Sequence, residues 1–288
     1  LDYYAKWTPI EYVITYNLFG GSYVGEGNPG NYNIEQEITL KTPAREGYVF
    51  GGWYTLSESG ERVEVIEKGT TGNIDLYARW IHISTITFET NGGHPISSIT
   101  KTAGEAVSAP INPTKDYYDF VEWYKDDALT IPYEFTVMPE EDITVYAKWT
   151  PTVYTITYVL NDGENDETNP DTYTVETETI VLKDASKTGY TFIKWFDSAE
   201  YTNVVTEIVK GSHGNIVLYS NYKINQYTIT FESNGGTSVE PITQNYATAV
   251  SEPSAPAKNG YIFDGWYSDE TLENKYVFNT IPAENITI

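Results

Sequence analysis

Gly47-Tyr48-Val49-Phe50-Gly51-Gly52-Trp53-Tyr54 is the segment that decides the fold, because its aromatic pattern occurs four times in the 288 residues. In each copy a Phe follows the Tyr by two residues, a Trp follows it by five, and another aromatic residue comes next. The other copies are at 118–124, 189–196 and 260–267. A period of two places the Tyr and the Phe on one face of a β-strand. The odd step from Phe to Trp requires either a bulge before the Trp or a Trp on the opposite face.

The copies alternate between two kinds of repeat. Trp53 and Trp195 are 142 residues apart, whereas Trp123 and Trp266 are 143 apart. A fixed period of this kind indicates tandem repeats, so we predict four small domains. The predicted segments are a closing strand of a preceding repeat at 1–9, long repeats at 10–81 and 152–223, and short repeats at 82–151 and 224–288, the last without its closing strand.

Each repeat is expected to begin and end with a strand. Apolar residues and Thr alternate in Tyr12-Val13-Ile14-Thr15-Tyr16 and its counterparts, which is the pattern of a half-buried strand. The closing segment 74–80 alternates in the same way and places Trp80 on the inward face. In the short repeats the first strand runs into Asn-Gly-Gly at 91–93 and 234–236. This sequence predicts a tight hairpin whose partner strand follows at once.

The composition favours strands and excludes several classes of function. The 26 Tyr, 10 Phe and 7 Trp residues prefer strands, and prolines before the aromatic strands leave room for a turn or two of helix at most. We therefore expect a mostly β protein made of small α+β domains. The absence of Cys excludes disulfides, thiolate metal sites and Cys nucleophiles. A net charge of −24 argues against nucleic acid as a partner, and no apolar run is long enough for membrane insertion.

The recurring aromatic residues are the predicted core. A domain of about 70 residues without disulfides needs a concentrated hydrophobic core, and each aromatic ring buries about 150–250 Å². Because these residues recur at strand positions, we expect them to form the core rather than a ligand-binding face. They are Tyr48, Phe50, Trp53, Trp80, Phe120, Trp123, Trp149, Phe192, Trp195, Phe263 and Trp266.

The order of these segments resembles a known family. The strand Tyr-Thr-Ile-Thr-Phe at 227–231, Asn-Gly-Gly at 234–236, Gly-Tyr-x-Phe-x-Gly-Trp-Tyr at 260–267 and Tyr-Ala-Lys-Trp at 146–149 closely resemble the internalin-B-type repeat, also called the Listeria-Bacteroides repeat. The resemblance covers nearly the whole chain. The long repeats depart from it in their expanded first loop, and the second has Tyr222 where the closing Trp belongs.

This resemblance implies a fold and a setting. It implies small β-grasp-like, ubiquitin-like domains carried in tandem on secreted or surface-attached bacterial proteins, where they act in adhesion, in host or matrix interaction or as spacers. It supplies no catalytic residues. Links of two or three residues between the repeats leave neighbours little freedom. We therefore expect an extended, semi-rigid rod of about 100–120 Å.

Loop residues of the long repeats are the candidates for contact with a ligand or a metal. Tyr23, Tyr32 and Tyr173 belong to Gly- and Asn-rich segments that vary between the copies, and exposed Tyr rings can stack on sugars or meet a protein. Asp162, Glu164 and Asp166 are calcium candidates, because carboxylate oxygens suit a hard cation. A solvated acidic loop is the simpler interpretation, since the spacing of a known calcium loop is missing.

No pattern of a catalytic site is present. The three histidines, His82, His94 and His213, are not part of a Gly-x-Ser-x-Gly or His-Glu-x-x-His sequence. We therefore expect no enzymatic activity and no cofactor.

The function that these observations favour is a non-enzymatic, extracellular region of a bacterial cell-surface protein, acting as a stalk or adhesion module. A host or matrix protein or a glycan would be the partner, together with neighbouring repeats of a longer parent protein. A carbohydrate- or mucin-binding module is the first alternative. The second is a self-assembling fibre or surface-layer element. It follows from the likeness of residues 1–7 to the closing strand 143–149, which suggests head-to-tail strand complementation.

Overall fold

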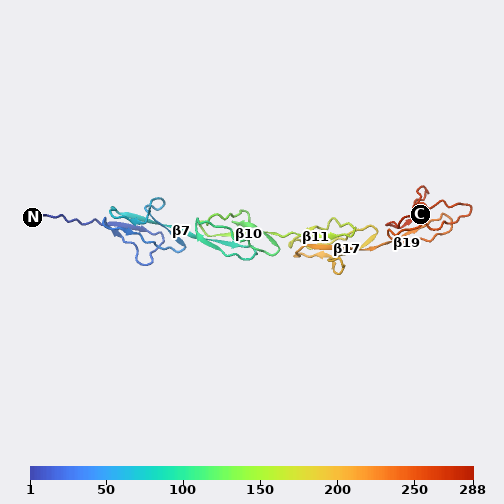
Figure 1. Ribbon diagram of the computed structural model, residues 1–288, viewed down its shortest axis with the longest axis horizontal. Coiled ribbons are helices and arrows are strands. Elements are labelled where there is room, and N and C mark those ends of the chain that lie inside the picture. Colours follow the sequence, from blue (N-terminus) through green and yellow to red (C-terminus); the bar gives the residue numbers. More distant parts are fainter. The chain divides into compact units, whose positions relative to one another are not determined.

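The computed structural model describes all 288 residues as strands, turns and loops (Figure 1). The chain forms two compact units, Leu1–Thr150 and Pro151–Ile288. The expectation of a mostly β protein is confirmed, but the helical part of the predicted α+β domains is wrong, because the structure contains no helix. In the link before the second aromatic strand, Pro110 and Pro113 each lack an N–H donor. Proline also biases the residue before it away from helical angles.

The sheet of the first repeat is built around its closing strand. β7 (Ile74–Glu89) lies between the parallel β1 (Tyr12–Asn17) and the antiparallel β4 (Tyr48–Tyr54). β2 (Asn31–Tyr32) pairs with the outer side of β1, and β5 (Arg62–Val63) pairs with β4. The strand that enters the repeat and the strand that leaves it are therefore parallel neighbours.

The third repeat has the same order. It is β12-β11-β17-β14-β15, with β17 again between the first strand and the aromatic strand. The bounds are β11 (Tyr154–Val159), β12 (Thr172–Tyr173), β14 (Tyr190–Phe196), β15 (Val204–Val205) and β17 (Ile216–Ile224). Each long repeat also has a separate two-stranded pair, made of β3 (Ile38–Thr39) with β6 (Val65–Ile66) in the first and β13 (Ile180–Val181) with β16 (Glu207–Ile208) in the third.

In the long repeats, the strand that pairs antiparallel with the first strand has two residues, whereas in the short repeats it has four. In the second repeat, β8 (Ile99–Thr102) pairs with β7, β10 (Ile143–Pro151) runs parallel to β7, and β9 (Tyr118–Tyr124) lies beyond β10. The fourth repeat contains β18 (Gln226–Thr230), β19 (Ile242–Asn245) and β20 (Ile286–Thr287), in the order β19-β18-β20. Its aromatic segment at 260–267 belongs to no strand.

A bulge explains the odd spacing of the aromatic strand. The pairing of β4 with β7 shifts between Phe50 and Gly52, and that of β14 with β17 shifts between Phe192 and Lys194. The extra residue turns the Trp back to the face that carries the Phe, so both rings enter the same core. Gly52 adopts a φ of 126° at this point.

The hairpin expected after the Asn-Gly-Gly turn forms differently from the prediction. Asn91 and Asn234 do adopt the left-handed conformation, with φ of 48° and 45°. The partner strand does not follow at once, because β8 starts only at Ile99. The amide of His94 donates a hydrogen bond of 2.8 Å to the Thr114 carbonyl, which draws the chain away from β7 directly after the turn.

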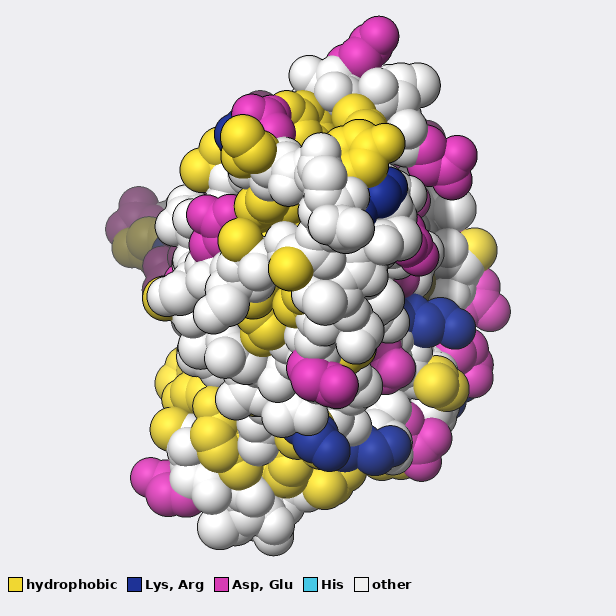
Figure 2. Space-filling model, turned by 90° about the vertical axis from the view of Figure 1, so that its right-hand side faces the viewer, with side chains coloured by type: hydrophobic (Ala, Val, Ile, Leu, Met, Phe, Trp, Pro, Cys, Tyr) yellow, Lys and Arg dark blue, Asp and Glu magenta, His cyan; other side chains and the backbone are white.

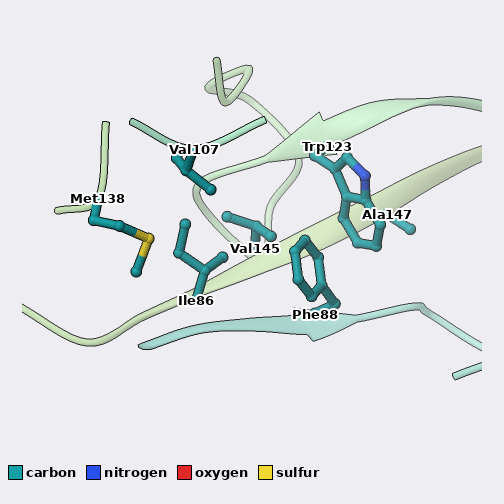
Figure 3. Packing of buried hydrophobic residues seen from close by; sticks show 7 residues of the cluster. All are labelled: Ile86, Phe88, Val107, Trp123, Met138, Val145 and Ala147. Carbon is teal, nitrogen blue, oxygen red and sulfur yellow. The ribbon is translucent and has the colours of Figure 1, made fainter. Parts of the chain in front are cut away.

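Each repeat has its own hydrophobic core. In the second repeat the Phe88 ring meets the Trp123 ring edge-on at 4.9 Å, and Val145 and Ala147 of β10 belong to the same cluster (Figure 3). The four tryptophans of the aromatic segments are only 2–4% exposed. The other predicted core residues pack against the four clusters, with one exception, and these residues are Phe50, Trp80, Phe120, Trp149, Phe192 and Phe263.

Tyr48 is the exception, and the prediction that it is a core residue is wrong. Its ring lies under the Arg45 guanidinium at 3.8 Å and against His82 at 5.1 Å. The side chain is half-buried and outside the core cluster. Phe50 occupies the inward position next to Trp53, with the ring centres 5.5 Å apart.

An amide or carboxylate side chain joins the last strand to the first in all four repeats. Asn73 Oδ1 accepts a hydrogen bond of 3.0 Å from the Val13 amide. The corresponding pairs are Asp142 with Thr85, Asn215 with Thr155 and Asn285 with Thr228. Each bond satisfies a backbone donor beside the parallel pair and helps to fix the register of that pair.

The connection between the long and the short repeat differs between the two units. In the first unit β7 continues without interruption for 16 residues and serves both repeats. In the second unit Asn225 separates β17 from β18. The Asn225 carbonyl accepts from the Tyr246 amide at 2.9 Å, and its side chain accepts from the Thr191 hydroxyl at 2.7 Å. Asn225 therefore holds the connection by hydrogen bonds where the strand is interrupted.

The burial of the aromatic strand predicts a local loss of stability in a variant. Trp195→Ala removes a side chain that is 2% exposed, and such truncations cost about 3–5 kcal/mol. Hydrogen exchange of the full chain should show protection falling by this free energy in 154–221. The matched control Ile193→Ala, two residues away and 44% exposed, should cost less than about 1 kcal/mol. Equal effects of the two substitutions would contradict the inward position of the tryptophan.

Candidate functional site

The closing strand of the second repeat places its last aromatic residue in a defined socket. The Trp149 indole N–H donates to the Thr90 carbonyl at 2.8 Å, and the ring meets the edge of Phe120 at 5.6 Å. A Cβ on Gly93 would overlap the Trp149 ring, so glycine forms the floor. We name this arrangement of a glycine floor, a carbonyl acceptor and a Phe edge the closing socket.

A lysine completes the closing socket. The Lys115 ammonium lies 4.4 Å from the Tyr118 ring and 5.9 Å from the Trp149 ring, and it donates to the Asn91 carbonyl at 3.0 Å. It therefore connects the left-handed turn, the aromatic strand and the closing strand. Cation–π contacts of this kind contribute about 0.5–1 kcal/mol at exposed sites and more when water is excluded.

The first and third repeats have the same socket with other residues. Trp80 donates to the Leu18 carbonyl at 2.9 Å above Gly21, and Arg45 takes the place of the lysine over Tyr48. In the third repeat Tyr222 lies above Gly163, and Lys187 lies 4.7 Å from Tyr190 and 5.7 Å from Tyr222. Tyr222 therefore fills the socket without a tryptophan, although its hydroxyl is buried and has no hydrogen-bond partner.

The fourth repeat has the glycine and the lysine that correspond to those of the closing socket, Gly236 and Lys258. A groove of about 960 Å³ runs along the aromatic segment and includes Gly236, Lys258, Phe263 and Trp266. Tyr261 is 71% exposed and Ile262 is 97% exposed. The face drawn in Figure 2 shows hydrophobic side chains in separate groups among polar and acidic ones.

The tyrosines predicted to contact a ligand have different positions. Tyr32 is fully buried and Tyr173 is 3% exposed, so the prediction of a ligand contact is corrected for both. Each lies in a short strand beside the first strand of its repeat and donates to a glycine carbonyl, Gly72 at 2.6 Å and Gly214 at 2.5 Å. Tyr23 is half-buried, and its hydroxyl accepts from the Asn28 side chain.

In each long loop, the Asn of the Asn-Pro step makes hydrogen bonds to the backbone of a lysine, as a neighbouring strand would. The Asn169 side chain accepts from the Lys183 amide at 2.8 Å and donates to its carbonyl at 3.0 Å. The Trp195 indole donates to the same carbonyl. Asn28, Lys41 and Trp53 repeat this network in the first repeat. These loops are therefore tied to the core and form part of it.

The acidic loop of the third repeat does not gather its carboxylates. Asp162 lies 3.9 Å from the Lys187 ammonium, and Asp166 accepts hydrogen bonds from the hydroxyl and amide of Thr168, which lower its pKa. Glu164 is exposed, and its backbone pairs with Ser186. No group of three acidic or histidine side chains in the chain is arranged to hold a metal ion. The calcium candidates are thus separate surface residues.

His82 and His94 occupy structural positions. Nδ1 of His94 is within 3.1 Å of the Thr114 carbonyl and 3.0 Å of its hydroxyl. The His82 ring packs against Tyr48 where the first two repeats meet. No helix long and apolar enough to cross a membrane is present.

The sequence contained a signal for the closing socket that motif reasoning missed. A basic residue precedes the first aromatic residue of every copy by three positions, as in Lys187-Thr188-Gly189-Tyr190 and Lys258-Asn259-Gly260-Tyr261. Only the structure shows that this residue also reaches the Asn carbonyl of the preceding turn, at 2.6 Å for Lys187 and 2.7 Å for Lys258.

Comparisons with known proteins agree with the repeat pattern. A family model described as the Listeria-Bacteroides repeat domain matches 12–79, 85–148, 154–221 and 227–288. A protein of Evansella cellulosilytica, provisionally named a Gly-rich membrane protein, is 31% identical over 281 residues, which are 96% of this chain and 32% of that protein. A second protein of this organism, provisionally named a membrane protein, is 31% identical over 277 residues, or 92% of this chain and 40% of its own length.

An internalin is among the relatives. Internalin H of Listeria monocytogenes is 37% identical over 108 residues, which are 36% of this chain and 19% of that protein. The chain thus spans about a third of the length of the two Evansella relatives. The match of the family model to all four repeats confirms the resemblance inferred from the sequence.

A half-buried tyrosine in the first strand of the third repeat predicts instability in alkali. The Tyr158 hydroxyl donates to the Pro170 carbonyl at 3.0 Å, and burial raises its pKa to about 12. Because the folded state favours the neutral phenol, the stabilisation is complete below pH 10 and is lost as the pH rises from 10 to about 12. Tyr158→Phe should flatten this part of the curve when unfolding is followed by denaturant titration at each pH. Tyr3→Phe, at a position that is 90% exposed, should leave the curve unchanged, and the same curve for both variants would contradict the assignment.

Proposed function

This chain belongs to the Listeria-Bacteroides repeat family, and on that premise we propose that it is a non-enzymatic stalk region that carries mechanical load in an extracellular bacterial surface protein. The names of its relatives, an internalin and two membrane proteins, support a setting at the cell surface. A net charge of −24 supports repulsion between neighbouring stalks and high solubility.

The parallel pairing of the first and last strands carries this proposal. In the first repeat β1 and the start of β7 pair over four residues, from Ile14 with Ile74 to Asn17 with Tyr77. A pull on the chain enters such a repeat at one end of the pair and leaves it at the other. The force then acts along the strands and loads all ladder hydrogen bonds together instead of opening them one after another.

The same arrangement recurs along the chain. The second and third repeats each pair first and last strands over four residues, and the fourth pairs Ile229 and Thr230 with Ile286 and Thr287. We propose that each repeat is a β-grasp-like module without its helix, since the last strand lies centrally and parallel to the first. The strand order and the absence of a helix support this assignment.

Adhesion would depend on residues outside the scaffold that recurs in the four repeats. A host or matrix protein or a glycan would meet exposed loop residues, because the recurring Phe and Trp residues pack in the cores. The carbohydrate- or mucin-binding alternative has less support, since Tyr32 and Tyr173 are buried and Tyr23 is only half-exposed. We therefore place the stalk role first.

Pulling the full chain between its two ends tests the proposal. We expect separate unfolding events, each releasing roughly 240 Å for about 70 residues at 3.3–3.6 Å per residue.

A proline variant makes this experiment specific. Thr15→Pro removes a backbone donor from β1 beside Asp75, so it should lower the force of one event and leave the others unchanged. Thr100→Pro in the edge strand β8, outside the parallel pair, is the matched control and should change the rupture force less. Unfolding without resolved force peaks, or equal effects of both prolines, would refute the mechanical role.

A further inference from the structure

One side of the sheet in the first repeat carries an exposed aromatic ring beside a cation that has no acidic partner. We name it the outer face and define it by Phe19, Tyr77, Arg79 and Ile81. We propose that the outer face binds an extended acidic peptide segment of a partner protein, with a carboxylate at Arg79 and an apolar side chain on each side of it. The inference does not depend on the stalk role, because binding and resistance to force have separate readouts.

Phe19 stands at a position where a large side chain is unfavourable. Its φ is 45°, and the corresponding residues of the other repeats are Asn91, Asn161 and Asn234, with φ of 48°, 50° and 45°. Asparagine tolerates this left-handed conformation, whereas a bulky residue is an outlier there. The Phe19 side chain is 54% exposed, so packing in the core does not account for it. A side chain that is both strained and exposed indicates contact with another molecule.

Tyr77 holds the exposed ring in place. The rings of Phe19 and Tyr77 stack, with their centres 6.3 Å apart and their planes at 24°. Tyr77 lies on the outer side of β7, because its neighbours Leu76 and Ala78 are buried. The ring of Phe19 is therefore supported from one side and open to solvent on the other. A ring that is already held loses little freedom on binding, which favours affinity.

Arg79 is a cation without an acid. Its guanidinium lies 3.7 Å from the centre of the Tyr54 ring, and it takes part in none of the ion pairs of the chain. Its Nη2 atom is buried without a hydrogen-bond partner. Because Arg79 follows Tyr77 by two residues, the two side chains share one face and are about 7 Å apart along the strand. A carboxylate at the guanidinium would gain a charge-assisted hydrogen bond close to the exposed ring.

In the second repeat the chain itself supplies the acid at the corresponding place. Lys148 donates to the Tyr124 hydroxyl at 3.2 Å, and this hydroxyl donates to Oε1 of Glu122 at 2.9 Å. The residue of the first repeat that corresponds to Glu122 is Gly52, which is opposite Arg79 in the strand pairing. The first repeat thus has the cation and the ring of this network without its carboxylate, which a partner can supply.

The dimensions of the outer face fit an extended peptide. Ile81 continues the row of outward side chains and is 41% exposed, and Val49 opposite it is 42% exposed. From Tyr77 to Ile81 the row spans about 13 Å at 3.3–3.4 Å per residue. An extended segment with apolar, acidic and apolar residues at alternate positions has the same spacing as Tyr77, Arg79 and Ile81. Aromatic residues and Arg are also enriched in protein interfaces.

The acids on this side of the sheet are too distant to neutralise the cation. Asp75 precedes Arg79 by four residues of β7, or about 13 Å. Glu64 follows β5, two strands away from β7, and is paired with Arg62 at 3.3 Å. Neighbouring strands lie about 4.8 Å apart, and the Debye length is about 8 Å at 0.15 M ionic strength. Both acids are therefore largely screened at Arg79.

Titration of the full chain with short peptides tests the proposal. The probes are an array of seven-residue peptides with acetyl and amide ends, which have Val, Leu or Phe at the second and sixth positions, Asp or Glu at the fourth and Thr elsewhere. Each has a counterpart with Asn or Gln at the fourth position. We expect acidic members to bind with a Kd of about 1 mM or below, the range of weak specific binding. Their uncharged counterparts should bind roughly tenfold more weakly.

Two substitutions on the outer face separate the ring from the cation. Phe19→Asn introduces the residue of the other three repeats, so the free energy of unfolding should stay the same or rise while the peptide binds about tenfold more weakly. Arg79→Gln should abolish the preference for the acidic peptide over its counterpart. The matched controls are Lys148→Gln, whose ammonium already has a partner in the chain, and Ile111→Asn, at a position that is 93% exposed. Both controls should bind like the unchanged protein.

The outcomes that would overturn the proposal are distinct. Absence of binding by every acidic peptide up to about 1 mM, or equal binding by the unchanged protein and both outer-face variants, would refute the outer face as a binding site. Trigalacturonate is the probe for an acidic sugar, and binding of this sugar without binding of any peptide would refute the peptide as the occupant. Neither result changes the unfolding forces that test the stalk role.

Discussion

The structure of every repeat depends on the pairing of its last strand with its first. In both long repeats the closing strand lies centrally, between the first strand and the aromatic strand. The core residues Leu76 and Leu218 of these strands are fully buried. A segment at the end of the repeat thus completes both the sheet and the core, and a domain of about 70 residues has little buried surface to lose.

The long and short repeats stabilise the same core tryptophan in different ways. In the long repeats the indole N–H of Trp53 or Trp195 donates to a lysine carbonyl that an Asn side chain holds in place. In the short repeats the indole nitrogens of Trp123 and Trp266 are buried without a hydrogen-bond partner. An unsatisfied buried donor costs about 1–3 kcal/mol. The longer loop therefore contributes a polar contact to the core that the shorter repeat does without.

Periodicity predicted the strands well because it depends on local chemistry. The alternation in 74–80 identified the inward face of the closing strand. The spacing within Tyr48–Trp53 required either a bulge before the Trp or a Trp on the opposite face, and the structure has the bulge. The burial of Tyr32 and Tyr173 could not be predicted in this way, since each belongs to a strand of two residues inside a Gly- and Asn-rich loop. Their position depends on pairing with Tyr12 and Tyr154, which are distant in sequence.

Contacts that connect three segments were also beyond sequence patterns. The role of Lys115 depends on Asn91 and Trp149, which precede and follow it by more than twenty residues. The basic residue recurs in all four copies, but recurrence alone does not distinguish a surface charge from a cation held between rings. The distinction requires the left-handed turn at Asn91, where the carbonyl points toward the ammonium.

A single residue distinguishes the two connections between a long and a short repeat, because β7 is continuous whereas Asn225 separates β17 from β18. β7 pairs with β1 in its first half and with β10 in its second half, so the first two repeats share one continuous strand. In the second unit Asn225 interrupts the strand, and the two repeats are joined there by the hydrogen bonds of Asn225 and by the contact of the Tyr246 and Tyr190 rings, whose centres lie 6.1 Å apart. The coupling between neighbours is therefore set by the residue that connects them, while the fold of each repeat is set by its closing strand.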